Sequence, residues 1–252
     1  MTVYAARLSK AQLQSVPPEE RSLFLSIAHL VNEINALHKL VLWASDFSSG
    51  NEVEVHGQVS LTLMLLKLLA GKLKEGHKLL RKRFYGTAVS RDYEPSLRQE
   101  GRDALAEIKK YFGRSNNNVN YIRNNYAFHY SPDELDAVLP HVPEDLELYV
   151  ESGGSANNLY YFAEVLAGRA LLRSMGASDD QAAYRQLVEE IPKVARWFAV
   201  VCDSLMTEFL RRHAGGIWEG KAVEVPLGEL PPLLGVRLPW FTDTSDVHTG
   251  AA

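Results

Sequence analysis

The segment RNNYAFHY, residues 123–130, holds an arginine, two asparagines and a histidine within about two helical turns. Arg123 offers phosphate oxygens a planar, permanently charged fork of donors, and His129 has the side chain that exchanges protons nearest neutral pH. This pair suits a phosphodiester, because it can stabilise negative charge and move protons without a metal ion. The alternative is structural, with an ordinary surface arginine and a histidine that packs against Tyr126 and Phe128.

The length and composition predict a globular protein that folds without disulfides or metal. The chain has 252 residues, of which 46% are hydrophobic and 23% charged. We predict one helical bundle domain over residues 1–214 and an extended, proline-containing tail over residues 215–252. The formal charge of −4 excludes the strongly basic balance of a general nucleic-acid coat protein.

The charge is nevertheless uneven along the chain. Seven Lys and Arg stand against Glu75 alone between Lys67 and Arg83, so a phosphate backbone can lie there, with Lys78, Arg81 and Arg83 as candidate contacts. The alternative is the solvated face of an amphipathic helix. Residues 133–151 carry seven acids and no Lys or Arg, an asymmetry that can orient an RNA or guide self-assembly.

Several features indicate a cytoplasmic protein without a membrane span. Cys202 is the sole cysteine, and we interpret it as a small buried hydrophobe. The N-terminus lacks the apolar run of a secretory signal, and Lys67 and Lys72 interrupt the most apolar stretch. His29 and His38 have no neighbouring acid or cysteine at metal spacing, so neither a metal nor another cofactor is expected.

The apolar periodicity predicts a series of helices joined by short turns. Leu23, Ile27, Leu30, Ile34, Leu37 and Val41 form one face of a helix that begins near Pro18 and ends near Ser45. Gly71 and Gly76 lie inside the next helix, where they can bend it or allow another helix to approach closely. Further helices are expected over residues 53–84, 95–113, 118–129, 133–142, 159–175 and 179–212, with a short strand over 146–150. The apolar residues of the tail predict docking, with one short strand.

A helical chain with Arg123, Asn124 and His129 in this order resembles the HEPN superfamily. The hallmark of that family is an Arg, a polar residue directly after it, and a His after four to six intervening residues. The resemblance implies an all-α fold, with a HEPN-like four-helix core and additional C-terminal helices. The greater length, the strand-like residues 146–150 and the proline-rich tail depart from the simple bundle.

The resemblance also implies how the motif would act. Members form homodimers whose motifs meet at the interface, and many are metal-independent RNases. On an ideal helix Arg123 and His129 are about 9 Å and about 120° apart, which favours a cleft shared by two copies. Asn124 would position the phosphate or His129, and Asn125 would orient the imidazole. Tyr126 and Tyr130 would stack on a base or donate a hydroxyl.

Three functions follow from these observations. The first is an endoribonuclease of toxin or defence type, whose partners are RNA, a second copy of the chain, and an antitoxin or regulatory protein. The second is a catalytically inactive HEPN-like protein that binds RNA, a nucleotide or a protein. The third is an interaction module whose tail docks on a partner through Trp240 and Phe241.

Overall fold

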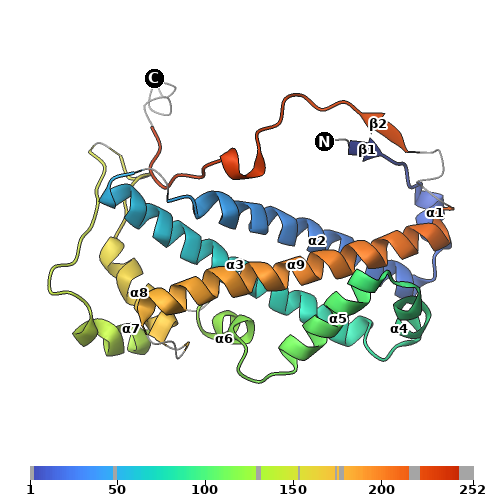
Figure 1. Ribbon diagram of the computed structural model, residues 1–252, viewed down its shortest axis with the longest axis horizontal. Helices are drawn as coiled ribbons and strands as arrows, with labels where there is room; N and C mark the ends of the chain where they lie inside the picture. Colours follow the sequence, from blue (N-terminus) through green and yellow to red (C-terminus); the bar gives the residue numbers. More distant parts are fainter. Residues whose placement is uncertain are drawn as a thin grey trace. The chain divides into compact units, whose positions relative to one another are not determined.

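The computed structural model describes residues 3–47, 50–128, 132–152, 154–173, 175, 179–215 and 222–243. It is an all-α helical bundle, which confirms the predicted fold class (Figure 1). The α-helices are α1 (Lys10–Ser15), α2 (Pro18–Ala44), α3 (Glu52–Arg83), α4 (Ala88–Tyr93), α5 (Gln99–Phe112), α6 (Asn118–Asn125), α7 (Pro132–Val138), α8 (Tyr161–Arg173) and α9 (Asp180–His213). Two strands, β1 (Val3–Ala5) and β2 (Val223–Val225), pair antiparallel. Three short 3₁₀ turns are Glu94–Ser96, Leu139–His141 and Leu233–Gly235.

The chain forms two compact units. Unit 1 comprises residues 1–36, 72–120 and 192–232, and unit 2 comprises residues 37–71, 121–191 and 233–252. Helices α2, α3, α6 and α9 contribute residues to both units. Each unit is described by itself below.

Unit 1 has a core of aliphatic and aromatic side chains. Leu23, Ile27, Leu30 and Ile34 of the predicted apolar face are buried there. The position of Gly76 confirms the expected close approach, because a Cβ atom there would lie 2.8 Å from a methyl carbon of Leu30 and 2.9 Å from the ring of Phe198. Cys202 is also buried, and burial raises the pKa of its thiol to about 12, so it packs as a neutral side chain.

An ion-pair cluster lies at the C-terminal end of α9 in unit 1. The buried Glu208 carboxylate accepts from Arg211 Nη2 at 2.7 Å and from Arg212 Nε at 2.6 Å. The Arg212 guanidinium lies 4.1 Å from the ring centroid of Tyr93. The Tyr93 hydroxyl donates to Glu20, which also contacts His213 at 2.8 Å. The cluster therefore holds the ends of several helices of this unit together.

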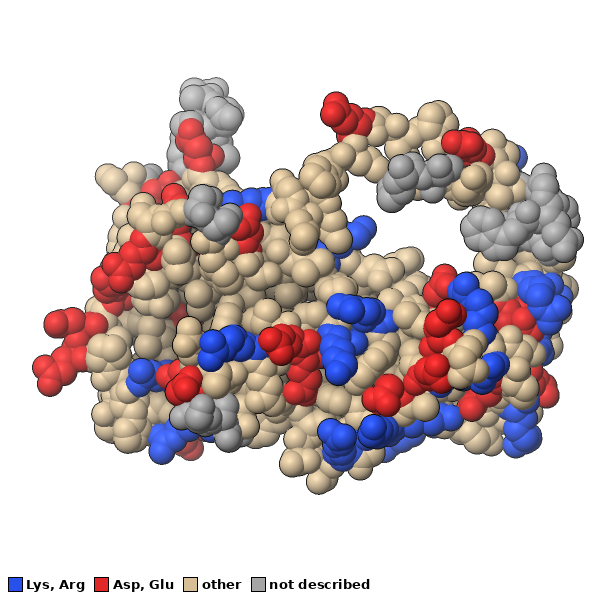
Figure 2. Space-filling view, viewed as in Figure 1, with Lys and Arg blue, Asp and Glu red and all other residues tan. Residues whose placement is uncertain are grey.

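Unit 2 is built on the N-terminal half of α3. Leu65, Leu66 and Leu69 of that helix are buried, and α7 and α8 lie side by side (Figure 1). The tail docks on this unit as expected, because Leu238 N donates to the Trp43 carbonyl oxygen at 3.1 Å. Figure 2 shows acidic side chains along the connection between α7 and α8, where the sequence has its run of acids.

Several predicted elements are wrong in detail, including the helix expected over residues 133–142, whose α-helical part ends at Val138. Residues 146–150 do not form a strand but contribute one antiparallel bridge, between Tyr149 and Leu159. The helix expected from Pro95 instead begins at Gln99, because Pro95 lies in the 3₁₀ turn that precedes it. The tail contains the predicted short strand, β2, whose partner is the unpredicted N-terminal strand β1.

One described helix, α3, is long and apolar enough to cross a membrane when judged by length and composition alone. Half of its most apolar window is buried inside the protein. Core helices of globular proteins have the same property.

The Glu208 cluster predicts how stability depends on pH. Hydrogen bonds from Arg211 and Arg212 lower the pKa of Glu208 from 4.5 to about 2. A lowered folded-state pKa stabilises the protein above pH 4.5, and this contribution is lost as the pH falls toward 2. We expect Glu208→Gln to lower the free energy of unfolding at pH 7 by about 3 kcal/mol, and by progressively less below pH 4.5.

Urea denaturation of both proteins across pH 2–7 measures this difference. Asp203→Asn is the matched control, because Asp203 pairs with Arg98 on the surface and its removal should cost less than about 1 kcal/mol. A Glu208→Gln effect that is small, or the same at every pH, would contradict the prediction.

Candidate functional site

Helix α6 carries the first residues of the Arg123 motif. The Asn117 side chain caps its start by accepting from Asn120 N at 2.9 Å. The helix ends at Asn125, after which the backbone N–H groups of Tyr126 and Ala127 both donate to the Ile122 carbonyl oxygen, at 2.8 and 2.9 Å. The prediction that the helix continues to residue 129 is therefore wrong.

This early end changes the geometry expected for the motif. Arg123 and His129 do not share one straight helix, so the rotation calculated from an ideal helix does not apply to them. His129 and Tyr130, expected as catalytic and base-binding residues, lie outside the described residues.

The polar residues of the motif differ in exposure. Arg123 is half-buried, whereas the next residue, Asn124, is exposed. The Asn125 side-chain amide donates to the Tyr121 carbonyl oxygen at 2.9 Å, one turn back along the helix. The Asn125 side chain therefore satisfies a backbone carbonyl at the C-terminal end of α6, a role that the sequence did not predict.

Tyr126 is held by other polar side chains. Burial raises its pKa well above the usual value, and hydrogen bonds with Glu134 and Tyr121 add to the effect. The Tyr121 and Tyr126 ring centroids are 5.7 Å apart. Because its hydroxyl is engaged in these contacts, Tyr126 is better suited to position the segment than to supply the free hydroxyl that was expected.

Phe128 packs where α3 has no side chain. A Cβ atom at Gly71 would lie 2.7 Å from Cε2 of the Phe128 ring and 3.6 Å from the Ala127 Cβ. The Phe128 side chain nevertheless stays accessible, since the residue is 60% exposed. Gly71 thus allows the end of the motif to lie directly on α3, although the segment that approaches it is not the expected helix.

A groove of about 420 Å³ lies beside this segment in unit 2. Its walls combine aromatic, thioether and charged side chains from α3, the motif, α8 and the tail. The side chains that define its chemistry are Met64, Lys67, Tyr126, Phe128, Glu164 and Trp240. The volume falls within the range of small-molecule and cofactor sites.

The candidate phosphate contacts Lys78, Arg81 and Arg83 belong to unit 1, whereas residues 121–128 belong to unit 2. Lys78 Nζ pairs with Glu75 at 2.7 Å, and Arg81 and Arg83 lie exposed in the last turn of α3. There they also compensate the partial negative charge at the helix C-terminus. These contacts suit the structural interpretation of the basic stretch as well as the binding one.

A second polar cluster in unit 2 surrounds His56 on α3, and no sequence pattern predicted it. The His56 Nδ1 atom lies 2.7 Å from the Tyr149 hydroxyl oxygen and 3.3 Å from a Glu147 carboxylate oxygen. Its ring stacks on Tyr161 with centroids 3.9 Å apart. Burial raises the pKa of Tyr149, and its hydrogen bond to Glu147 adds to the effect. These contacts attach the acidic segment to α3.

Within the described residues, no group of three or more His, Cys, Asp and Glu side chains is placed to hold a metal ion. Comparisons with models of known protein families, with curated proteins and with solved structures find no match to this chain.

The contact between Gly71 and Phe128 can be tested by a double-mutant cycle. We expect Gly71→Ala to lower the free energy of unfolding by about 1–2 kcal/mol, because the new methyl group displaces the Phe128 ring. In a Phe128→Ala background the same change should be neutral or stabilising, since alanine favours a helix over glycine by about 1 kcal/mol.

Urea denaturation of the four proteins gives the coupling energy. Gly168→Ala on α8 is the matched control, because its Cβ atom would lie 3.4 Å from Leu63, an ordinary contact distance. Equal effects of Gly71→Ala in both backgrounds would show that Phe128 does not pack on Gly71.

Proposed function

We propose that this chain is a metal-independent endoribonuclease whose active site contains Arg123, Asn124 and His129. The observation that carries the proposal is the position of the motif beside an open groove. Residues 126–128 of the motif, which directly follow α6, line a groove of about 420 Å³ that also holds a lysine and a tryptophan. Single-stranded RNA is bound by this combination of side chains.

The proposed reaction is a transesterification within the RNA strand. His129 takes the proton of a ribose 2′-hydroxyl, and the 2′-oxygen attacks the adjacent phosphorus. The bond from phosphorus to the 5′-oxygen breaks, and the leaving oxygen takes up a proton. The products are a 2′,3′-cyclic phosphate and a 5′-hydroxyl. Arg123 stabilises the negative charge that develops on the phosphate, and the exposed Asn124 contacts a phosphate oxygen.

The remaining parts of the proposal come from the HEPN resemblance. The enzyme acts in the cytoplasm as a homodimer, in which the two motifs meet across a twofold axis. An antitoxin or regulatory protein restrains its toxicity. Arg123 is half-buried, which suits a side chain that contacts a phosphate once the second subunit covers the site.

Cleavage of total RNA in the presence of EDTA tests this proposal. We expect the wild-type protein to cut RNA and leave 2′,3′-cyclic phosphate ends. Arg123→Ala and His129→Ala should each reduce the rate by at least about 100-fold, the usual loss when a general acid or base or a charge-stabilising donor is removed. Arg114→Ala, at an exposed arginine of unit 1, is the control and should leave the rate unchanged.

The possible results separate the candidate functions. If the wild type binds RNA without cutting it, the protein is an inactive binding member of the same kind. Cleavage that persists in both variants, or that EDTA abolishes, would contradict the assignment of the active site.

A further inference from the structure

The floor of the groove is one stripe of α3. Gly57, Ser60, Met64, Lys67 and Gly71 recur at steps of three and four residues, so they lie along the same face of the helix. Ser60, Met64 and Lys67 line the groove. Along an ideal helix the two glycines are about 21 Å apart, a distance that a few extended nucleotides can span.

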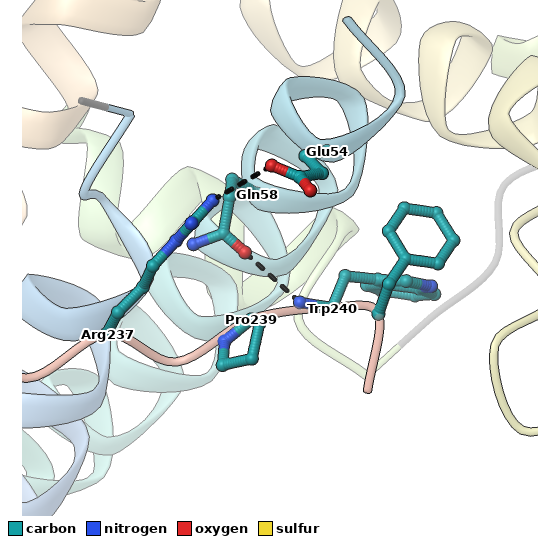
Figure 3. A pocket seen from close by; sticks show the side chains of 6 residues that line it. Glu54, Gln58, Arg237, Pro239 and Trp240 are labelled. Atoms are coloured by element: carbon teal, nitrogen blue, oxygen red, sulfur yellow. Dashed lines mark hydrogen bonds and ion pairs between the residues drawn. The ribbon is translucent and has the colours of Figure 1, made fainter. Parts of the chain in front are cut away.

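Each glycine of this stripe lies in close contact with one aromatic residue. Gly71 lies under the Phe128 ring, as described above. A Cβ atom at Gly57 would lie 2.7 Å from the Trp240 Cβ, so the tail lies directly on α3 there. The Trp240 backbone N–H donates to Gln58 Oε1 at 3.1 Å, which fixes the tail at this point (Figure 3).

Both aromatic side chains keep groups that the fold does not bury or pair. Phe128 is 60% exposed, and Met64 between the two glycines is 40% exposed. The Trp240 indole Nε1 is buried without an acceptor in the described part of the chain. Buried donors in proteins normally have a partner, so the described contacts leave this N–H unsatisfied.

The charges in the groove are balanced. Lys67 comes from α3 and Glu164 from α8, and neither forms an ion pair with another described residue. Around the groove unit 2 is rich in acids, so an extended polyanion would gain little there from charge alone. The aromatic rings must supply most of the affinity for any strand that lies in the groove.

We infer that this groove holds single-stranded RNA by base stacking, with bases on Phe128 and Trp240 and one phosphate at Lys67. This inference rests on the proposed function, because it takes RNA as the substrate. It makes the C-terminal tail a part of the substrate site, since Trp240 forms one of its walls. It also implies that the groove recognises unpaired bases, because only an unstacked base can lie on an aromatic ring.

Fluorescence anisotropy with a labelled 2′-O-methyl tetra-adenylate tests the inference, because this probe cannot undergo attack by a 2′-hydroxyl. An abasic tetranucleotide with the same phosphates should bind at least about tenfold more weakly. Phe128→Ala and Trp240→Ala should each weaken binding of the tetra-adenylate by about tenfold. Phe128→Tyr and Trp240→Phe, which keep a ring, should bind within about threefold of wild type.

One control and one further variant complete the design. Tyr160→Ala removes a tyrosine that is 57% exposed in the same unit but does not line the groove, and it should leave binding unchanged. Lys67→Ala should reduce the slope of log affinity against log salt by about 0.7, the value for one phosphate contact to a single strand.

Equal binding of the tetra-adenylate and the abasic tetranucleotide would overturn the inference. Equal affinities of wild type, Phe128→Ala and Trp240→Ala for the tetra-adenylate would also overturn it. If the wild type cuts total RNA but these variants bind and cut normally, the inference fails while the proposed function stands. If the wild type never cuts RNA but stacking-dependent binding is found, the proposed function fails and the groove assignment stands.

Discussion

The candidate site depends on the contact between Phe128 and the backbone of α3 at Gly71. A side chain at residue 71 would meet the Phe128 ring, so glycine allows the segment after α6 to lie directly on this helix. The same stripe of α3 receives the tail at Gly57. A long core helix with two gaps in its side-chain surface therefore brings together the motif and the C-terminal tail, which are far apart in the sequence. Between these two gaps lie the exposed Met64 and the cationic Lys67.

The distribution of charge separates two kinds of surface. Unit 1 has more Lys and Arg than acids, and the last turn of its part of α3 is basic. Part of this charge serves the fold, since Lys72 pairs with Glu33 at 2.7 Å and Lys78 with Glu75. His77 in the same stretch adds no cation, because burial, with Lys74 and Arg81, lowers its pKa to about 4. Unit 2 has an excess of acids, so its groove favours neutral, flat groups over phosphates. The basic surface therefore belongs to unit 1, whereas the aromatic groove suited to base stacking belongs to unit 2.

The elements that the sequence predicts well are those that local pattern determines. The bounds of α2 and α3 follow from proline, acidic first turns and apolar periodicity, and the close helix approach expected at Gly76 is confirmed. The end of α6 at Asn125 was missed, because the residues that follow carry no proline or glycine and turn away where Phe128 packs on a distant helix. The cluster of His56 and Tyr149 was also missed, since its partners are 93 residues apart. The division into two units could not be predicted from the sequence, because four of its five boundaries fall inside helices.

Photochemical cross-linking tests the central claim, that RNA lies on the α3 stripe between the motif and the tail. A short single-stranded RNA that carries 4-thiouridine would be bound to the full chain, irradiated and digested, and the modified peptides identified by mass spectrometry. We predict adducts on the peptides that contain Phe128 and Trp240, and their loss when Gly71→Ala moves the Phe128 ring away from α3. Adducts confined to the basic last turn of α3, at residues 81–83, with none on the Phe128 and Trp240 peptides, would contradict the claim.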